Sequence, residues 1–147
     1  MIDIEKLHAM VWAFRRETEH VFPVPSRLDS LYFAFTEAGE ALDAYLRQNR
    51  DYKRNRDRQH SVEREFAQAL MMLMTAYGPK QWRSGYWPGT VKIGDVCYLV
   101  GKAARYGDDI SIACAVRAIC QYVPTIEDEL AAALDALRAK HLEPVHD

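Results

Sequence analysis

The stretch that decides the fold reads Ser-Val-Glu-Arg-Glu-Phe-Ala-Gln-Ala-Leu-Met-Met-Leu-Met-Thr-Ala-Tyr over residues 61–77. Apolar residues recur in it every three or four positions, and from Ala69 to Ala76 only Thr75 interrupts them. A helix that is apolar on nearly every side is buried by its neighbours. Ser61 is a typical N-cap, and a glycine followed by a proline ends the stretch. It therefore predicts a central helix in a domain built from other helices.

Helical periods extend from this segment in both directions, and no alternating apolar run is bounded like a hairpin. Ser26 with Asp29 is a capping pair for the second helix, Thr90 is a candidate cap for the fourth, and either Asp109 or Ser111 can begin the fifth. The six helices are predicted over residues 3–20, 27–48, 61–77, 90–106, 109–122 and 125–142. Residues 1–147 are thus expected to form one all-α domain, a bundle of about five to six helices.

The inner faces of the first three helices follow from the spacing of their apolar residues. The predicted stripes are Ile4, Leu7, Val11 and Phe14 in the first helix, Leu28, Leu31, Phe35, Leu42 and Tyr45 in the second, and Val62, Phe66, Ala69, Leu70 and Leu73 in the third. Residues 79–89 hold Trp82, Tyr86 and Trp87, so this loop must pack on something or close over something.

Composition narrows the functional classes. Hydrophobic residues make up 49% of the chain and charged residues 27%, which is ordinary for a soluble globular protein. The net charge of −2 argues against a dedicated nucleic-acid binder. No apolar run is long enough to span a membrane and the N-terminus does not read as a signal peptide. Cys97, Cys114 and Cys120 lie in apolar runs and are expected to be buried, reduced thiols. These features predict a cytoplasmic protein.

Acidic residues at helical spacing are the candidate chemical group. Glu37 and Glu40 lie one turn apart on the second helix, and Glu65 and Gln68 lie one turn apart on the third. Two partly dehydrated carboxylates held close together would each favour the neutral form, and a bound divalent cation removes that conflict. The alternative is that these acids are solvated or paired with arginine and lysine, as most surface acids are.

The string Glu37-Ala-Gly-Glu40, followed by Glu65-Phe-Ala-Gln68 at the start of an apolar helix, resembles the two acidic motifs of MazG-like nucleoside triphosphate pyrophosphohydrolases. The resemblance covers about residues 1–78, and residues 90–142 form a helical extension. It implies Mg²⁺-dependent cleavage of a nucleoside or deoxynucleoside triphosphate to the monophosphate and pyrophosphate. It also implies Glu37, Glu40, Glu65 and Gln68 as metal ligands, and a homodimer or higher homo-oligomer. Either Glu37 or Glu40 is the expected base for the attacking water.

One departure from the family pattern opens an alternative. Gln68 stands where the family has aspartate, so the site loses a negative charge. Asp43 or Glu63 could replace that charge, or the protein could be a degenerate member that binds a nucleotide or a protein partner without efficient hydrolysis. A purely structural bundle with solvated acids is the third possibility.

Basic and aromatic residues supply candidate substrate contacts. Lys53 and Arg54, together with Arg56 and Arg58, could bind the outgoing pyrophosphate, and Asn55 could contact the nucleotide. Lys102 on the fourth helix could also reach a phosphate. Candidates for stacking on a base are Trp12, Tyr32, Trp82 and Trp87, with core packing or a subunit contact as the alternative. The apolar loop and the apolar second half of the third helix would fit a subunit interface.

Overall fold

The computed structural model describes residues 2–49, 61–86 and 91–142. The helices in these ranges are α1 (Ile4–Thr18), α2 (Arg27–Asn49), α3 (Val62–Tyr77), α4 (Ile93–Tyr106), α5 (Asp109–Tyr122) and α6 (Ile126–Leu142). The described part of the chain contains no strand, so the predicted all-α bundle is confirmed. Across those same ranges, none of the helices combines the length and the apolarity that crossing a membrane requires.

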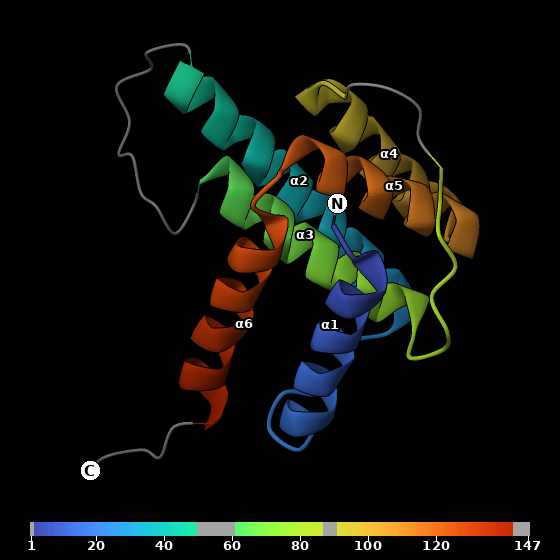
Figure 1. Ribbon diagram of the computed structural model, residues 1–147, viewed down its shortest axis with the longest axis vertical. Coiled ribbons are helices and arrows are strands. Elements are labelled where there is room, and N and C mark those ends of the chain that lie inside the picture. The colour runs from blue at the N-terminus through green and yellow to red at the C-terminus, as the bar shows by residue number, and fades with distance from the viewer. Residues whose placement is uncertain (1, 50–60, 87–90, 143–147) are drawn as a thin grey trace.

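Helix α3 is the central element of the bundle. It packs against α1 and α6 and also against α2 and α5, while α4 covers α2 and α5 (Figure 1). Its residues from Ala69 to Tyr77 are all buried, as the sequence predicted. Because helices of the same chain cover it, this apolar half does not provide the free subunit surface that its composition suggested.

The inner face of α2 differs from the prediction. Leu31 is buried, but Leu28 is 52% and Phe35 is 54% exposed, and Leu42 is exposed too. The buried apolar residues of α2 are mostly small: Leu31, Ala34, Ala38, Ala41 and Ala44. Alanine side chains let two helix backbones approach closely, and α2 and α3 run close together over much of their length. The bulky residues of α2 are therefore turned outward. In α1 and α3, by contrast, all the predicted inner residues are buried.

Capping residues set most helix boundaries. The hydroxyls of Ser26 and Ser61 accept hydrogen bonds from the backbone N–H groups of Asp29 and Arg64, as predicted. Helix α5 begins at Asp109, with Asp108 as its N-cap. Helix α4 begins at Ile93, later than expected, because the Asp95 carboxylate accepts a hydrogen bond from the Lys92 N–H at 2.9 Å. The proposed cap Thr90 lies outside the described residues.

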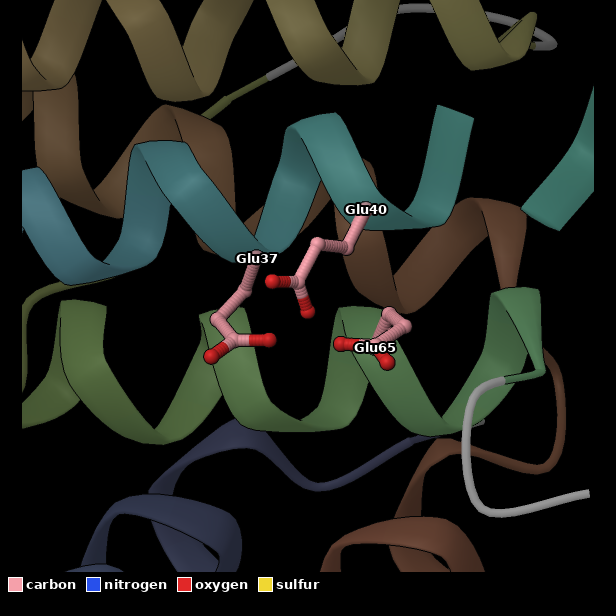
Figure 2. A group of neighbouring side chains, drawn as sticks. All are labelled: Glu37, Glu40 and Glu65. Carbon is pink, nitrogen blue, oxygen red and sulfur yellow. The ribbon is translucent and has the colours of Figure 1, made fainter. Parts of the chain in front are cut away.

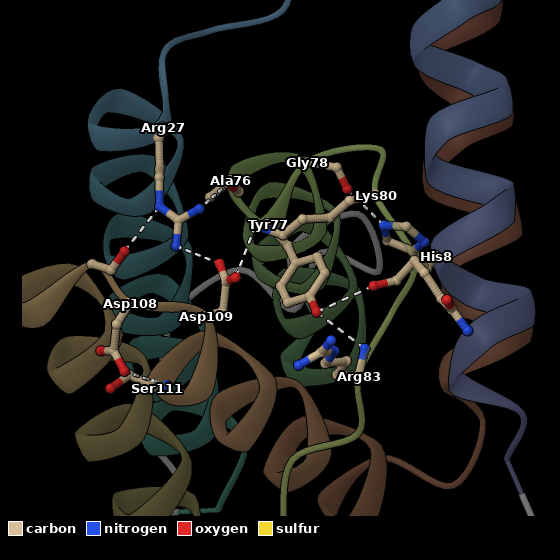
Figure 3. Close-up of polar contacts among 12 residues, drawn as sticks. His8, Arg27, Ala76, Tyr77, Gly78, Lys80, Arg83, Asp108, Asp109 and Ser111 are labelled. Atoms are coloured by element: carbon tan, nitrogen blue, oxygen red, sulfur yellow. Dashed lines mark hydrogen bonds and ion pairs between the residues drawn. The ribbon is translucent and has the colours of Figure 1, made fainter.

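Arg27 joins one end of α2 to three other segments, as Figure 3 shows. Its guanidinium donates to the backbone oxygens of Gly107 and Ala76 at 2.8 and 3.3 Å. A third bond, 2.8 Å long, reaches the Asp109 carboxylate, which also pairs with Lys80 at 2.7 Å. Hydrogen bonds from Lys80 and Arg27 lower the pKa of Asp109. The start of α2 is thereby fixed to the ends of α3 and α4 and to the start of α5.

The loop after α3 packs back onto the bundle. Trp82 is only 4% exposed, and its ring lies 4.4 Å from that of Tyr77 and 5.4 Å from that of His8. Gly85 lies against the backbone of α5, where a Cβ atom would come within 2.4 Å of the carbonyl carbon of Ala113. Trp82 is therefore a packing residue and is not available to stack on a base. Trp87 lies outside the described residues.

Candidate metal centre

Three glutamates from two helices meet at the α2–α3 interface. Figure 2 shows Glu37 and Glu40 projecting from α2 toward α3, which carries Glu65. Each residue offers one carboxylate oxygen, and these oxygens all lie within 4.8 Å of one another. Among the described residues, these three acids form the only group of His, Cys, Asp and Glu side chains close enough to share a metal ion. The predicted convergence of positions 37, 40 and 65 is present in the structure.

Local sequence explains why the acids meet there. Ala38 and Ala41 are buried, so the glutamates that directly precede them lie at the edge of the buried face of α2. On α3, Glu65 directly precedes the fully buried Phe66 and is itself only 1% exposed. The packing of the two helices thus leaves Glu65 buried and Glu37 half-buried, while Glu40 remains exposed at the edge of the interface.

Burial and mutual repulsion make the ionised forms of Glu37 and Glu65 unfavourable. The pKa of Glu37 is raised to about 9, first by burial and then by the hydrogen bond and charge of Glu65 and by the charge of Glu40. Burial also raises the pKa of Glu65, an effect that the positive charge of Arg47 opposes. Oε2 of Glu37 is buried and has no hydrogen-bond partner among the described residues. The ionised form of Glu37 is therefore costly in the metal-free protein, and a divalent cation bound at this group would offset that cost.

Nearby charged side chains are engaged with other partners. Arg47 forms an ion pair with Asp43 at 3.3 Å, and Arg64 forms one with Glu129 at 3.0 Å. Asp43 and Glu63 are not members of the three-glutamate group. Neither of them therefore replaces the charge that Gln68 lacks.

Gln68 lies beside the glutamates, in the wall of a cavity. The cavity has a volume of about 670 Å³ and is lined by Glu37 as well as Gln68. It extends over the first turns of α3 and reaches α6 at Leu137 and Lys140. This cavity was not predicted, because no feature of the sequence indicates that α6 lies next to the acidic motifs.

Of the remaining predicted contacts, those that fall within the described residues lie away from this site. Lys53, Arg54 and Asn55, with Arg56 and Arg58, lie outside the described residues. Lys102 is exposed on α4 and lines neither the cavity nor the three-glutamate group. Among the aromatic candidates, Trp12 donates its indole N–H to the Met74 backbone oxygen and Tyr32 is exposed.

The buried positive charge of Arg15 was also not predicted from the sequence. Arg15 has no exposed surface, and its guanidinium donates to Oγ1 of Thr75 at 3.1 Å and to Sδ of Met72 at 3.4 Å. Desolvation lowers its pKa to about 10. The one indication in the sequence that Arg15 is buried was its position in the apolar stripe of α1, one residue after Phe14.

Comparison of the chain with models of known protein families, with curated proteins and with solved structures finds no match.

Proposed function

We propose that this protein hydrolyses a nucleoside or deoxynucleoside triphosphate to the monophosphate and pyrophosphate in a Mg²⁺-dependent reaction. The observation that carries the proposal is the three-glutamate group, whose oxygens lie within 4.8 Å of one another in a partly buried space. Hard carboxylate oxygens on rigid helices suit Mg²⁺, so Glu37, Glu40 and Glu65 would hold it. The bound ion would supply positive charge to the phosphate oxygens.

The reaction itself needs few other groups. The oxygen of a water molecule forms a bond to the α-phosphorus, the bond from that phosphorus to the bridging oxygen breaks, and pyrophosphate leaves. Glu37 or Glu40 accepts the proton of the water. Phosphoryl transfer depends mainly on positioning and charge stabilisation, and two helices fixed against each other provide the positioning.

The choice of a nucleotide rests on the resemblance of the two acidic motifs to MazG-like pyrophosphohydrolases and on the cavity beside Glu37. The test is release of pyrophosphate from each common nucleoside and deoxynucleoside triphosphate, with Mg²⁺ or with a chelator. We expect turnover that requires Mg²⁺ and is lost in Glu40→Gln and Glu65→Gln. Absence of turnover of every triphosphate by the folded wild-type protein would contradict the proposed activity.

The second candidate function is nucleotide or partner binding without efficient hydrolysis, and Gln68 favours it. Gln68→Asp distinguishes the two. A large gain in turnover would show that the natural site is impaired, whereas an unchanged rate would show that glutamine is compatible with the reaction. Release of pyrophosphate by the wild type at an ordinary rate would exclude this second candidate.

An outward-facing apolar stripe on α2 supports a second copy of the chain as partner. The stripe consists of the exposed residues Leu28, Tyr32, Phe35, Leu42 and Leu46. With Gly39 they repeat at alternating intervals of four and three, the spacing by which helices pair. At Gly39 a Cβ atom would meet nothing within 4 Å, so another helix backbone can approach there. We propose a homodimer through this stripe, which light scattering on the purified protein would detect.

We also propose that the protein acts in the cytoplasm. A reducing compartment fits the free Cys97, Cys114 and Cys120, of which Cys120 is buried and the other two are half-buried. Redox-sensitive localisation tags or cell fractionation would test this assignment.

A further inference from the structure

The cavity beside the three-glutamate group has the size and composition of a small-molecule site. Its volume of about 670 Å³ lies within the range of roughly 300–1,000 Å³ typical of ligand pockets. Most of its lining is apolar, including Phe33, Met71, Met72 and Leu137. Glu37 is part of both the cavity wall and the three-glutamate group, so a ligand in the cavity reaches the candidate metal site directly.

The apolar lining suits a flat aromatic ring. Phe33 is more than half exposed, so one of its faces is free to stack. Methionine sulfurs make favourable contacts with aromatic rings, and Met71 and Met72 lie on the α3 side of the cavity. A purine or pyrimidine base has the required flat shape, and its polar edge requires a matching polar group.

Gln68 provides that polar group. It is half-buried in the cavity wall, and its amide makes no hydrogen bond with any residue that the structure describes. A glutamine amide offers one acceptor oxygen and two N–H donors. It can therefore form a pair of hydrogen bonds with a base edge that presents an acceptor beside a donor. An aspartate at this position would instead add a fourth negative charge next to Glu37.

The cavity wall is held in place before a ligand binds. The buried Arg15 guanidinium donates to the sulfur of Met72 and lies 5.2 Å from the ring centre of Phe22, another lining residue. Phe22 is stacked on His141 at 4.2 Å with an interplanar angle of 8°. The Arg64–Glu129 ion pair joins α3 to α6. A preformed wall loses little freedom on binding, which favours affinity.

From these observations we infer that the α3–α6 cavity binds the nucleoside part of a nucleotide, and that Gln68 recognises the edge of its base. The inference rests on the proposed function, because it takes the phosphates of the same nucleotide to lie at the three-glutamate group. It makes Gln68 the residue that selects the base. It also gives α6 a function in binding the nucleoside, although α6 lies outside residues 1–78, the part of the chain that carries the family resemblance.

The test compares ligands with and without a base. The ligand without a base is inorganic tripolyphosphate, and the ligands with a base are the α,β-methylene analogues of the common nucleoside and deoxynucleoside triphosphates. Each is titrated, together with Mg²⁺, into the full chain in a calorimeter. Ala136→Trp places an indole in the cavity, and Ala139→Trp on the same helix is its control because Ala139 is exposed and does not line the cavity. Gln68→Leu removes the amide, with Gln48→Leu on exposed α2 surface as control.

We expect wild-type protein to bind one base at least tenfold more tightly than tripolyphosphate. Gln68→Leu should reduce the preference among bases by about tenfold or more, the scale of a lost bidentate contact. Ala136→Trp should weaken every nucleotide analogue and leave tripolyphosphate unchanged, and both controls should match the wild type. Circular dichroism and thermal melts verify that each variant folds.

The outcomes separate the two proposals. If Mg²⁺-tripolyphosphate binds, but every nucleotide binds within twofold of it and both cavity variants leave affinities unchanged, the cavity inference is refuted and the metal-site proposal survives. If neither tripolyphosphate nor any nucleotide binds in the presence of Mg²⁺, both are refuted.

Discussion

Magnesium should stabilise this protein, and the stabilisation should increase with pH. Cation binding requires the ionised form of Glu37, whose pKa in the metal-free protein is about 9. At pH 7 that carboxylate is therefore mostly protonated. The apparent Mg²⁺ affinity should therefore rise about tenfold per pH unit from pH 7 to pH 9 and level off above it.

The expected shift in melting temperature follows from this affinity. A ligand present at a hundred times its dissociation constant adds about 2.7 kcal/mol to the free energy of unfolding. For a chain of 147 residues, that corresponds to a rise of roughly 5–10 °C. At a fixed Mg²⁺ concentration that saturates the site at pH 9, the rise should be nearly absent at pH 6.

The metal-free protein should show the opposite dependence on pH. The pKa of Glu37 is raised from an ordinary 4.5 to about 9, so the folded state binds a proton that the unfolded state releases. The stability that this proton contributes is fully present below about pH 4.5 and is lost as the pH rises through about 9. Glu37→Gln, which resembles the protonated side chain, should flatten this decline and abolish the effect of Mg²⁺.

Thermal melts monitored by circular dichroism at pH 6, 7, 8 and 9, with MgCl₂ and with chelator, would measure both effects. Glu63→Gln is the matched control, since Glu63 is exposed on α3 and is not part of the three-glutamate group. A Mg²⁺-induced rise of equal size at pH 6 and pH 9, or an undiminished rise in Glu37→Gln, would refute the reasoning.

Three further predictions concern packing and assembly. Gly85→Ala should destabilise the protein by about 2 kcal/mol in urea unfolding, because the new methyl group would meet the α5 backbone. The control Gly94→Ala should be neutral or slightly stabilising, because the space around Gly94 is open. Arg15→Met should change the free energy of unfolding by less than about 1 kcal/mol, because it removes a buried charge and keeps most of the side-chain volume. Arg15→Ala should instead cost about 3 kcal/mol, because it leaves a cavity. Equal losses in the two variants would contradict this account. Tyr32→Glu should shift the protein toward the monomer in light scattering without lowering its helix content, because it places a charge in the proposed interface.

The sequence predicted helices well and the orientation of one helix poorly. Cap and stop residues such as Ser26, Ser61 and Gly107 act locally, so their effects can be read from a few neighbouring positions. Helix α2 carries two stripes with helical spacing, one of alanines and one of larger residues. Hydrophobicity favours burial of the larger stripe, but close packing against α3 selected the alanines. That choice depends on the partner helix and cannot be derived from α2 alone.

The candidate site was predictable to a similar degree. Spacing within α2 and the acidic start of α3 indicated that Glu37, Glu40 and Glu65 could converge, and they do. The cavity was not predictable, because it brings Gln68 together with Lys140, which lies far along the chain on a helix without a recognisable motif. The burial of Arg15 likewise follows from tertiary packing, since arginine is rarely found without exposed surface.

The Arg27 hydrogen bonds secure α2 at its first turn only, near the last turn of α3. Farther along the same pair of helices, repulsion among the glutamates opposes close approach until a cation or protons neutralise it. Backbone amides in the first turns of α2 should therefore exchange slowly with deuterated solvent under all ionic conditions. Those between Glu37 and Gln48 should lose protection as the pH rises past about 9, where Glu37 ionises, and regain it when Mg²⁺ is added, so that one helix would contain a permanently closed half and a half whose closure depends on neutralising the glutamates.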